Sequence, residues 1–138
     1  MKFLLDTHAL WDHATGNRDH LPPAVVQALT TCLAKDLHFL DISLYELSRH
    51  LALGRIQVAA PLGALKKMEQ IYKGIHSDAE ITWMAASLDW QKRNGKGEHL
   101  DPADRAIMAT AKLRDLTLVT ADREMQAFAP ELGVEVFW

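Results

Sequence analysis

Two hydrophobic patterns alternate along the 138-residue chain: short unbroken apolar runs, and longer stretches with an apolar residue at every third or fourth position. Unbroken runs are typical of buried strands, whereas the wider spacing is typical of amphipathic helices. The pattern predicts strands at residues 2–6, 37–42, 116–120 and 133–138. It predicts helices at residues 21–35, 43–54, 61–74, 77–92, 101–115 and 122–128, with a loop over 91–101.

This alternation of strands and helices predicts an α/β fold with a mostly parallel central sheet flanked by helices. The length suits one domain, and the chain contains no linker-like stretch, so we expect a single domain over residues 1–138. Parallel strands joined by helices end at the same sheet edge, and ligands bind there, where the strand order reverses. The residues that directly follow the strands are therefore the first candidates for a site.

Composition narrows the possible functions. The net charge of −3 argues against a protein that grips nucleic acid through bulk positive charge, although a local basic rim is compatible with it. We find neither a signal-peptide core nor a membrane-length apolar run, so we expect a soluble, cytoplasmic protein with no membrane partner. The single cysteine excludes an internal disulfide, and the seven histidines show no zinc-site spacing.

Four acidic residues lie close behind the ends of predicted strands. Asp6 ends the first strand, and Glu46 lies one turn into the helix after the second. Asp104 lies in the first turn of the helix that begins with "DPADR", and Asp122 lies two residues past "LTLVT". A parallel sheet can bring all four to one edge although they are far apart in sequence.

Each acid also has a purely structural interpretation. Asp6 and Asp122 could end a strand or begin a helix, and Asp101 is the natural N-cap for the helix that carries Asp104. Ser43 precedes Glu46 by three residues, which is the spacing of a capping box. These interpretations explain each residue alone but not why all four occur together.

Grouped carboxylates need a counter-charge. Two carboxylates about 5 Å apart repel by roughly 3 kcal/mol at an effective dielectric near 20. Mg²⁺ favours oxygen ligands together with several waters, and Mn²⁺ is its usual substitute. Such an ion lowers the pKa of a bound water and polarises a phosphate, which is the chemistry of phosphodiester hydrolysis.

Four stretches of the chain resemble the successive motifs of PIN-domain ribonucleases, especially the VapC-like toxins of type II toxin–antitoxin pairs. They are "LLDTHALW", "ISLYELSRHLALGRI", "HLDPADRAIMATA" and "LTLVTADREMQAF". The resemblance implies a PIN fold and an endoribonuclease that depends on Mg²⁺ or Mn²⁺. It implies that Asp6, Glu46, Asp104 and Asp122 are catalytic metal ligands. It also implies a cognate antitoxin and a homodimer as partners.

Neighbouring residues are weaker candidates. Thr7, Ser43 and Thr120 carry hydroxyls beside the acids, and Arg105 could pair with a site carboxylate or make an ordinary salt bridge. His8 as a catalytic base is a remote option, because a metal ion can activate water itself. A basic stretch at 92–96 could contact RNA or be a solvated loop, and Trp11, Trp83 and Trp90 could serve in an interface or in the core.

Two alternative functions remain at this stage. A PIN-like RNA-binding or regulatory domain with little or no activity would keep the fold without catalysis. A phosphotransferase or receiver domain also places an Asp after its first strand. The first motif of this chain lacks a second acid two residues after Asp6, which argues against that alternative.

Overall fold

Five strands form one fully parallel sheet in a computed structural model that describes residues 1–91, 97–98 and 100–138. The strand order is β3-β2-β1-β4-β5. The strands are β1 (Phe3–Leu5), β2 (Leu37–Leu40), β3 (Lys73–Ile75), β4 (Thr117–Val119) and β5 (Val136–Phe137). The predicted α/β class with a parallel central sheet is confirmed.

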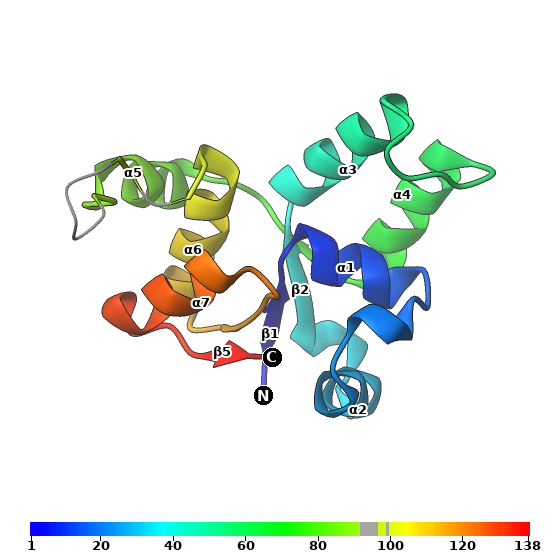
Figure 1. The fold of residues 1–138 in the computed structure, drawn as a ribbon, viewed down its shortest axis with the longest axis horizontal. Coiled ribbons are helices and arrows are strands. Elements are labelled where there is room, and N and C mark those ends of the chain that lie inside the picture. Colours follow the sequence, from blue (N-terminus) through cyan, green and yellow to red (C-terminus); the bar gives the residue numbers. More distant parts are fainter. Residues whose placement is uncertain (92–96, 99) are drawn as a thin grey trace.

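Helices cover both faces of this sheet (Figure 1). The first four lie on one side, with bounds α1 (Thr7–Ala14), α2 (Pro23–Thr31), α3 (Ile42–Ala52) and α4 (Pro61–Ile71). The remaining described helices lie on the other side, with bounds α5 (Ala79–Ser87), α6 (Pro102–Arg114) and α7 (Arg123–Phe128). Short 3₁₀ turns occur at Arg18–His20, Ala34–Asp36 and Ala129–Leu132.

The alternation of side chains along β1 explains why two separate cores form. Leu4 points into the cluster that packs against α5, α6 and α7. Phe3 and Leu5, its neighbours in sequence, point into the cluster beneath α1 to α4. Successive strand residues face opposite sides of a sheet, so a strand covered on both faces is apolar throughout. This is why β1 was recognisable as a continuous apolar run.

Two elements were missing from the sequence prediction. Helix α1 follows Asp6 directly, and the edge strand β3 occupies residues assigned to the end of the 61–74 helix. Helix α4 ends at Ile71, and Gly74 in β3 lies against the ring of Phe39, where a Cβ would meet the ring at 3.1 Å. The predicted helix was wrong here because the chain must turn to pair with β2.

Several elements are also shorter than the sequence predicted. The second strand ends at Leu40, the helix predicted at 21–35 is regular only over Pro23–Thr31, and the last strand comprises only Val136–Phe137. Helix α5 ends at Ser87, and Trp90 then enters the core, where it stacks on Phe128. Residues 92–96, with the basic side chains considered for RNA contact, lie outside the described part of the chain.

The strand order creates one crevice at the carboxyl edge of the sheet. The chain passes from β1 to β2 on one side, and β4 later pairs with β1 on the other side, with Leu5 opposite Val119. The order therefore reverses between β1 and β4, and the connections leave these two strand ends in opposite directions. Residues just after Leu5 and Val119 border that crevice.

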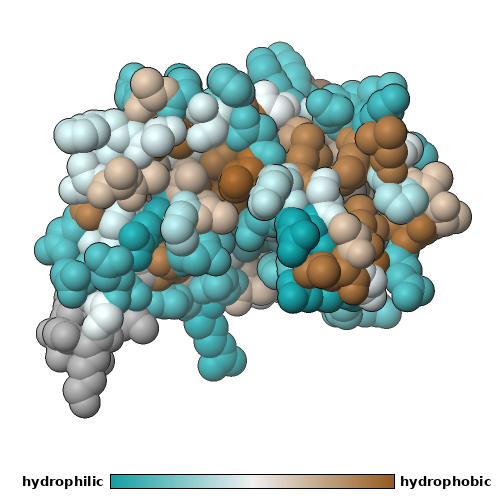
Figure 2. Space-filling model, turned by 90° about the horizontal axis from the view of Figure 1, so that it is seen from above, coloured by the Kyte–Doolittle hydropathy of each residue, from teal (hydrophilic) through white to brown (hydrophobic). Residues whose placement is uncertain are grey.

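The surface carries several exposed apolar side chains. Brown side chains gather over the right-hand half of Figure 2, the side where Figure 1 places α3 and α4. Tyr45 and Leu62, which are 65% and 64% exposed, belong to those helices. Within the residues that the structure describes, no helix is both long and apolar enough to cross a membrane.

Candidate active site

Asp6 occupies the position where β1 gives way to α1. Its amide donates to the carbonyl of Val119 on β4, and one carboxylate oxygen accepts from the amide of Ala9 at 2.8 Å, which caps α1. The hydroxyl of Thr120 donates to the other oxygen. The side chain is only 6% exposed, and burial raises the pKa of Asp6 although the bonds from Thr120 and Ala9 oppose the shift.

The side chain of Glu46, on α3, is positioned by a hydrogen bond from the neighbouring helix α1. The Thr7 hydroxyl on α1 donates to Glu46 Oε1 at 2.5 Å, and Thr7 Oγ1 lies 3.0 Å from Ser43 Oγ. Because the single hydroxyl proton of Thr7 goes to Glu46, Ser43 must donate to Thr7. The capping-box interpretation is therefore wrong: Asp41 holds the N-cap position of α3, and Ser43 lies buried inside the helix.

Asp104 lies in the first turn of α6, and Asp101 is the cap of that helix, as predicted. Asp101 accepts from the amide of Asp104 at 2.8 Å. Burial raises the pKa of Asp104 to about 7, with further contributions from the negative charges of Asp101, Glu46, Asp122 and Asp6. Asp104 thus lies near enough to the other three predicted acids to interact with their charges.

Asp122 and Thr120 follow β4. Asp122 caps α7 by accepting from the amides of Glu124 and Met125 at 2.8 and 2.9 Å. Its own amide donates to Thr120 Oγ1 at 3.0 Å. Thr120 therefore links the residue after β1 to the loop after β4, because its proton is donated to Asp6. Asp6 and Asp122 are thus helix N-caps as well as lining the site, and Asp104 lies in the first turn of a helix that Asp101 caps.

All four predicted acids line one cleft of about 450 Å³. The lining residues come from four different stretches of the chain: Asp6, Thr7, His8, Glu46, His50, Asp101, Asp104, Ala121 and Asp122. The cleft lies at the carboxyl ends of β1 and β4, where the strand order reverses. Sequence reasoning missed His50, although its position four residues after Glu46 puts both on one face of α3.

Arg105 lies outside this lining. Its guanidinium donates to Glu98 at 2.8 Å and lies over the ring of Trp90, 5.6 Å from the centroid. Of the two roles considered from sequence, these contacts correspond to the ordinary salt bridge. Arg105 therefore tethers the start of α6 to the preceding segment.

The donor set suits a hard divalent cation. In the part of the chain that the structure describes, the lining supplies five carboxylates and neither lysine nor arginine. Among the described residues, however, no three acidic, histidine or cysteine side chains are close enough to hold an ion as they stand. Carboxylates without a cation repel one another, so a bound cation would relieve the repulsion among them.

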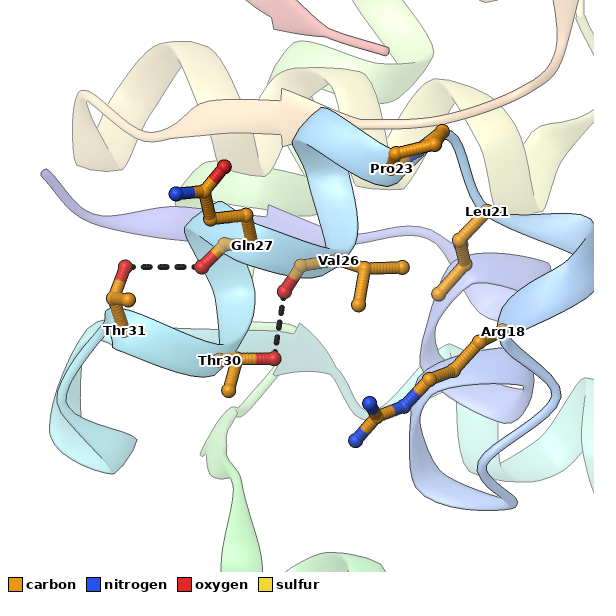
Figure 3. Close-up of a pocket in the computed structure, with 7 residues that line it drawn as sticks. All are labelled: Arg18, Leu21, Pro23, Val26, Gln27, Thr30 and Thr31. Carbon is orange, nitrogen blue, oxygen red and sulfur yellow. Dashed lines mark hydrogen bonds between the residues drawn. The ribbon is translucent and has the colours of Figure 1, made fainter.

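A second hollow of about 440 Å³ lies between the Arg18–His20 turn and α2 (Figure 3). Its described lining is mostly apolar and contains no acid, with Arg18 as its charged member. The hydroxyls of Thr30 and Thr31 donate to carbonyls of their own helix at Val26 and Gln27, as the dashed lines in Figure 3 show. These lining residues are unsuited to hydrolytic chemistry, so the acidic cleft is the candidate active site.

Fold and cleft together define a parallel α/β protein with an acidic site at the reversal of strand order. The sequence model of the PIN domain matches residues 3–130. The chain therefore belongs to the PIN domain family, whose members are generally nucleases. No curated protein matches the sequence closely enough to count as a relative.

Solved structures share this fold over nearly the whole chain. A chain of VapBC2 from Rickettsia felis, bound to a promoter DNA fragment, has a TM-score of 0.71 at 20% identity and covers 100% of this chain and 99% of its own. FitAcB from Neisseria gonorrhoeae has a TM-score of 0.68 at 24% identity, and the match covers 99% of this chain and 96% of that chain. DNA-bound VapBC from Salmonella typhimurium has a TM-score of 0.67 at 22% identity, and the match covers 99% of this chain and 97% of that chain. At these identities the likeness establishes the fold, which is VapC-like.

Proposed function

We propose that this protein is a Mg²⁺- or Mn²⁺-dependent endoribonuclease. The observation that carries the proposal is the convergence of Asp6, Glu46, Asp104 and Asp122 on one cleft, whose described lining contains neither lysine nor arginine. Membership of a family that generally consists of nucleases supports it. The four carboxylates would be the metal ligands, and an RNA strand would lie across the cleft.

The chain's own residues would each have a defined part in hydrolysis. Asp6 is buried and fixed by Thr120 and by the start of α1, so it gives the site a rigid ligand. Thr7 and Ser43 fix the orientation of Glu46 from a second helix. When bound, the ion would offset the carboxylate charge and supply an activated water and a polarised phosphate. Fixed ligands lessen the reorganisation that the reaction requires.

The proposal is tested by incubating purified protein with end-labelled structured RNA in Mg²⁺, in Mn²⁺ and in EDTA. We expect internal cleavage in either metal ion and none in EDTA. Asp6→Asn and Glu46→Gln should each lose about 100-fold or more in rate. Asp19→Asn removes an exposed acid outside the cleft and should cleave like the wild type.

The outcome also separates catalysis from mere binding. A wild type that binds the RNA but leaves it intact in both metal ions would support the RNA-binding or regulatory alternative. Equal cleavage by Asp6→Asn would show that the activity arises elsewhere. A single-stranded DNA of the same sequence, run in parallel, reports whether the enzyme is confined to RNA.

We further propose that the protein is the toxin of a toxin–antitoxin module acting in the cytoplasm. The support is that the structural neighbours named above come from VapBC and FitAB-type complexes. An antitoxin protein would then be its inhibitor, and the apolar surface over α3 and α4 suits a homodimer. Induced expression should arrest growth, and Asp6→Asn expressed at the same level should not.

A further inference from the structure

We propose that His8 and His50 form a subsite that binds an RNA backbone phosphate at the mouth of the acidic cleft. The two rings come from different helices, α1 and α3, and both line the cleft. Their centroids lie 6.2 Å apart with an interplanar angle of 39°. This inference rests on the proposed ribonuclease function and adds substrate-positioning residues to it.

Among the histidines that the structure describes, hydrogen bonding separates these two from the other four. His13, His20, His38 and His76 each bond another protein group, at distances of 2.6 to 3.4 Å. His20 and His76 do so although their side chains are 64% and 87% exposed. Within the described residues, His8 and His50 touch each other and have no hydrogen-bond partner. Their ring nitrogens therefore remain available to a ligand.

The charge of the cleft explains why a phosphate needs such groups. Five carboxylates line it, so an RNA phosphate entering it meets strong repulsion. The Thr7 hydroxyl already donates to Glu46, which leaves the two imidazoles as the side-chain donors of the lining. An imidazole has at least one N–H in either protonation state, so donation to a phosphate oxygen does not require a charged ring.

The ring spacing suits one phosphate better than a shared metal ion. N–H···O bonds of about 2.9 Å from each ring would reach different oxygens of a single phosphate. Mg²⁺ prefers oxygen ligands, which the five carboxylates of the lining supply and an imidazole does not. We therefore assign these rings to the substrate and the carboxylates to the metal.

The test measures steady-state RNA cleavage and, separately, Mn²⁺ affinity by isothermal titration calorimetry. The variants are the double substitution His8→Ala with His50→Ala, the conservative His50→Gln, and His20→Ala as a control outside the cleft. We expect the double variant to raise KM about 10- to 100-fold, the usual cost of losing bonds to a charged group. Its Mn²⁺ affinity should stay within about twofold of the wild type, because the rings bind substrate.

Two comparisons sharpen the result. His50→Gln keeps an N–H donor and should lie between the wild type and the double variant in KM, whereas His20→Ala should match the wild type. An unchanged KM in the double variant, or a parallel loss of Mn²⁺ affinity, would overturn the phosphate subsite. If the wild type itself cleaves no RNA, the proposed function fails as well, so the two failures are distinguishable.

Discussion

At the scale of single residues, Asp104 carries the clearest sign of unrelieved charge. Burial and four neighbouring carboxylates raise its pKa from 3.8 to about 7. Among the described residues, no lysine or arginine lines the cleft to oppose that charge. Functional sites commonly retain such unfavourable interactions, because the same groups are needed for binding or chemistry.

This charge predicts how stability depends on pH when metal is absent. The folded protein holds a proton on Asp104 up to about pH 7, whereas the unfolded chain releases it near 3.8. The folded state thus binds more protons across this interval, so the free energy of unfolding should fall as pH rises from about 4 to 7. Thermal unfolding in EDTA at pH 5 and pH 8 measures the change.

The matched variant for this prediction is Asp104→Asn, compared with Asp19→Asn on the exposed surface. Asp104→Asn removes the titrating group, so it should flatten the pH dependence and stabilise the protein at pH 8 by about 1 kcal/mol. Asp19→Asn should keep the slope of the wild type. If Asp104→Asn stays as pH-sensitive as the wild type, the pH dependence does not originate at Asp104.

At the scale of elements, the cleft depends on a connection between α1 and α3. Thr7 near the start of α1 bonds both Ser43 and Glu46 of α3. Ser43 is fully buried, so its hydroxyl has no water to replace a lost partner. This connection fixes the position of Glu46 relative to α1, the helix that Asp6 caps.

Replacing Thr7 by valine keeps the side-chain shape and removes both hydrogen bonds. We expect the free energy of unfolding to fall by about 1–2 kcal/mol, because buried polar oxygens lose a partner. Urea denaturation measures this loss. Thr15→Val removes an exposed hydroxyl at the end of α1 and should cost much less. Equal effects of the two substitutions would mean that the connection is energetically unimportant.

Hydrophobic patterning predicted the elements with distinctive sequences and missed those defined by tertiary contacts. The runs that form β1 and β4 are apolar because they are buried on both faces. By contrast, Lys73 and Gly74 look like the end of a helix, and only pairing with β2 makes this segment a strand. Helix α1 was missed because it is short and only Asp6 separates it from β1, so no turn-forming stretch marks its start.

The candidate site was predictable to the extent that it follows strand ends. Asp6 comes directly after β1 and Asp122 shortly after β4, and Glu46 and Asp104 were singled out by their places near the starts of predicted helices. The motif resemblance then implied a metal-binding role for all four. The sequence could not assign the partner of each polar group, because those partners are distant in the chain. Thr120 bonds a residue 114 positions away, and the role of Ser43 changed from a helix cap to a buried donor.

At the scale of the whole molecule, helices cover both faces of the sheet, and several exposed apolar side chains lie on these helices. Trp90 belongs to the core at 3% exposed, whereas Trp83 is 73% exposed. Of the tryptophans considered for an interface, Trp83 therefore remains the most accessible. A further apolar surface lies over α3 and α4 (Figure 2).

This surface leads to a prediction about association. We expect the isolated protein to sediment as a homodimer, since an exposed apolar patch marks an interaction surface. Leu62→Ser, on α4, should weaken the dimer and shift the equilibrium toward monomer. Leu33→Ser is a matched control, because Leu33 is 61% exposed and Leu62 is 64% exposed, but Leu33 lies outside α3 and α4. A monomeric wild type, or equal effects of the two substitutions, would contradict the prediction.

The proposed function depends above all on whether the acids after separate strands form one metal site. Anomalous diffraction from crystals soaked in Mn²⁺ tests this most directly, because the signal locates the ion independently of any assay. We predict a Mn²⁺ peak in the cleft, bonded directly to Asp6 and to at least one of Glu46, Asp104 and Asp122. A crystal with this cleft open to solvent that shows no peak there, or a peak only at a distant surface, would contradict the proposed metal site.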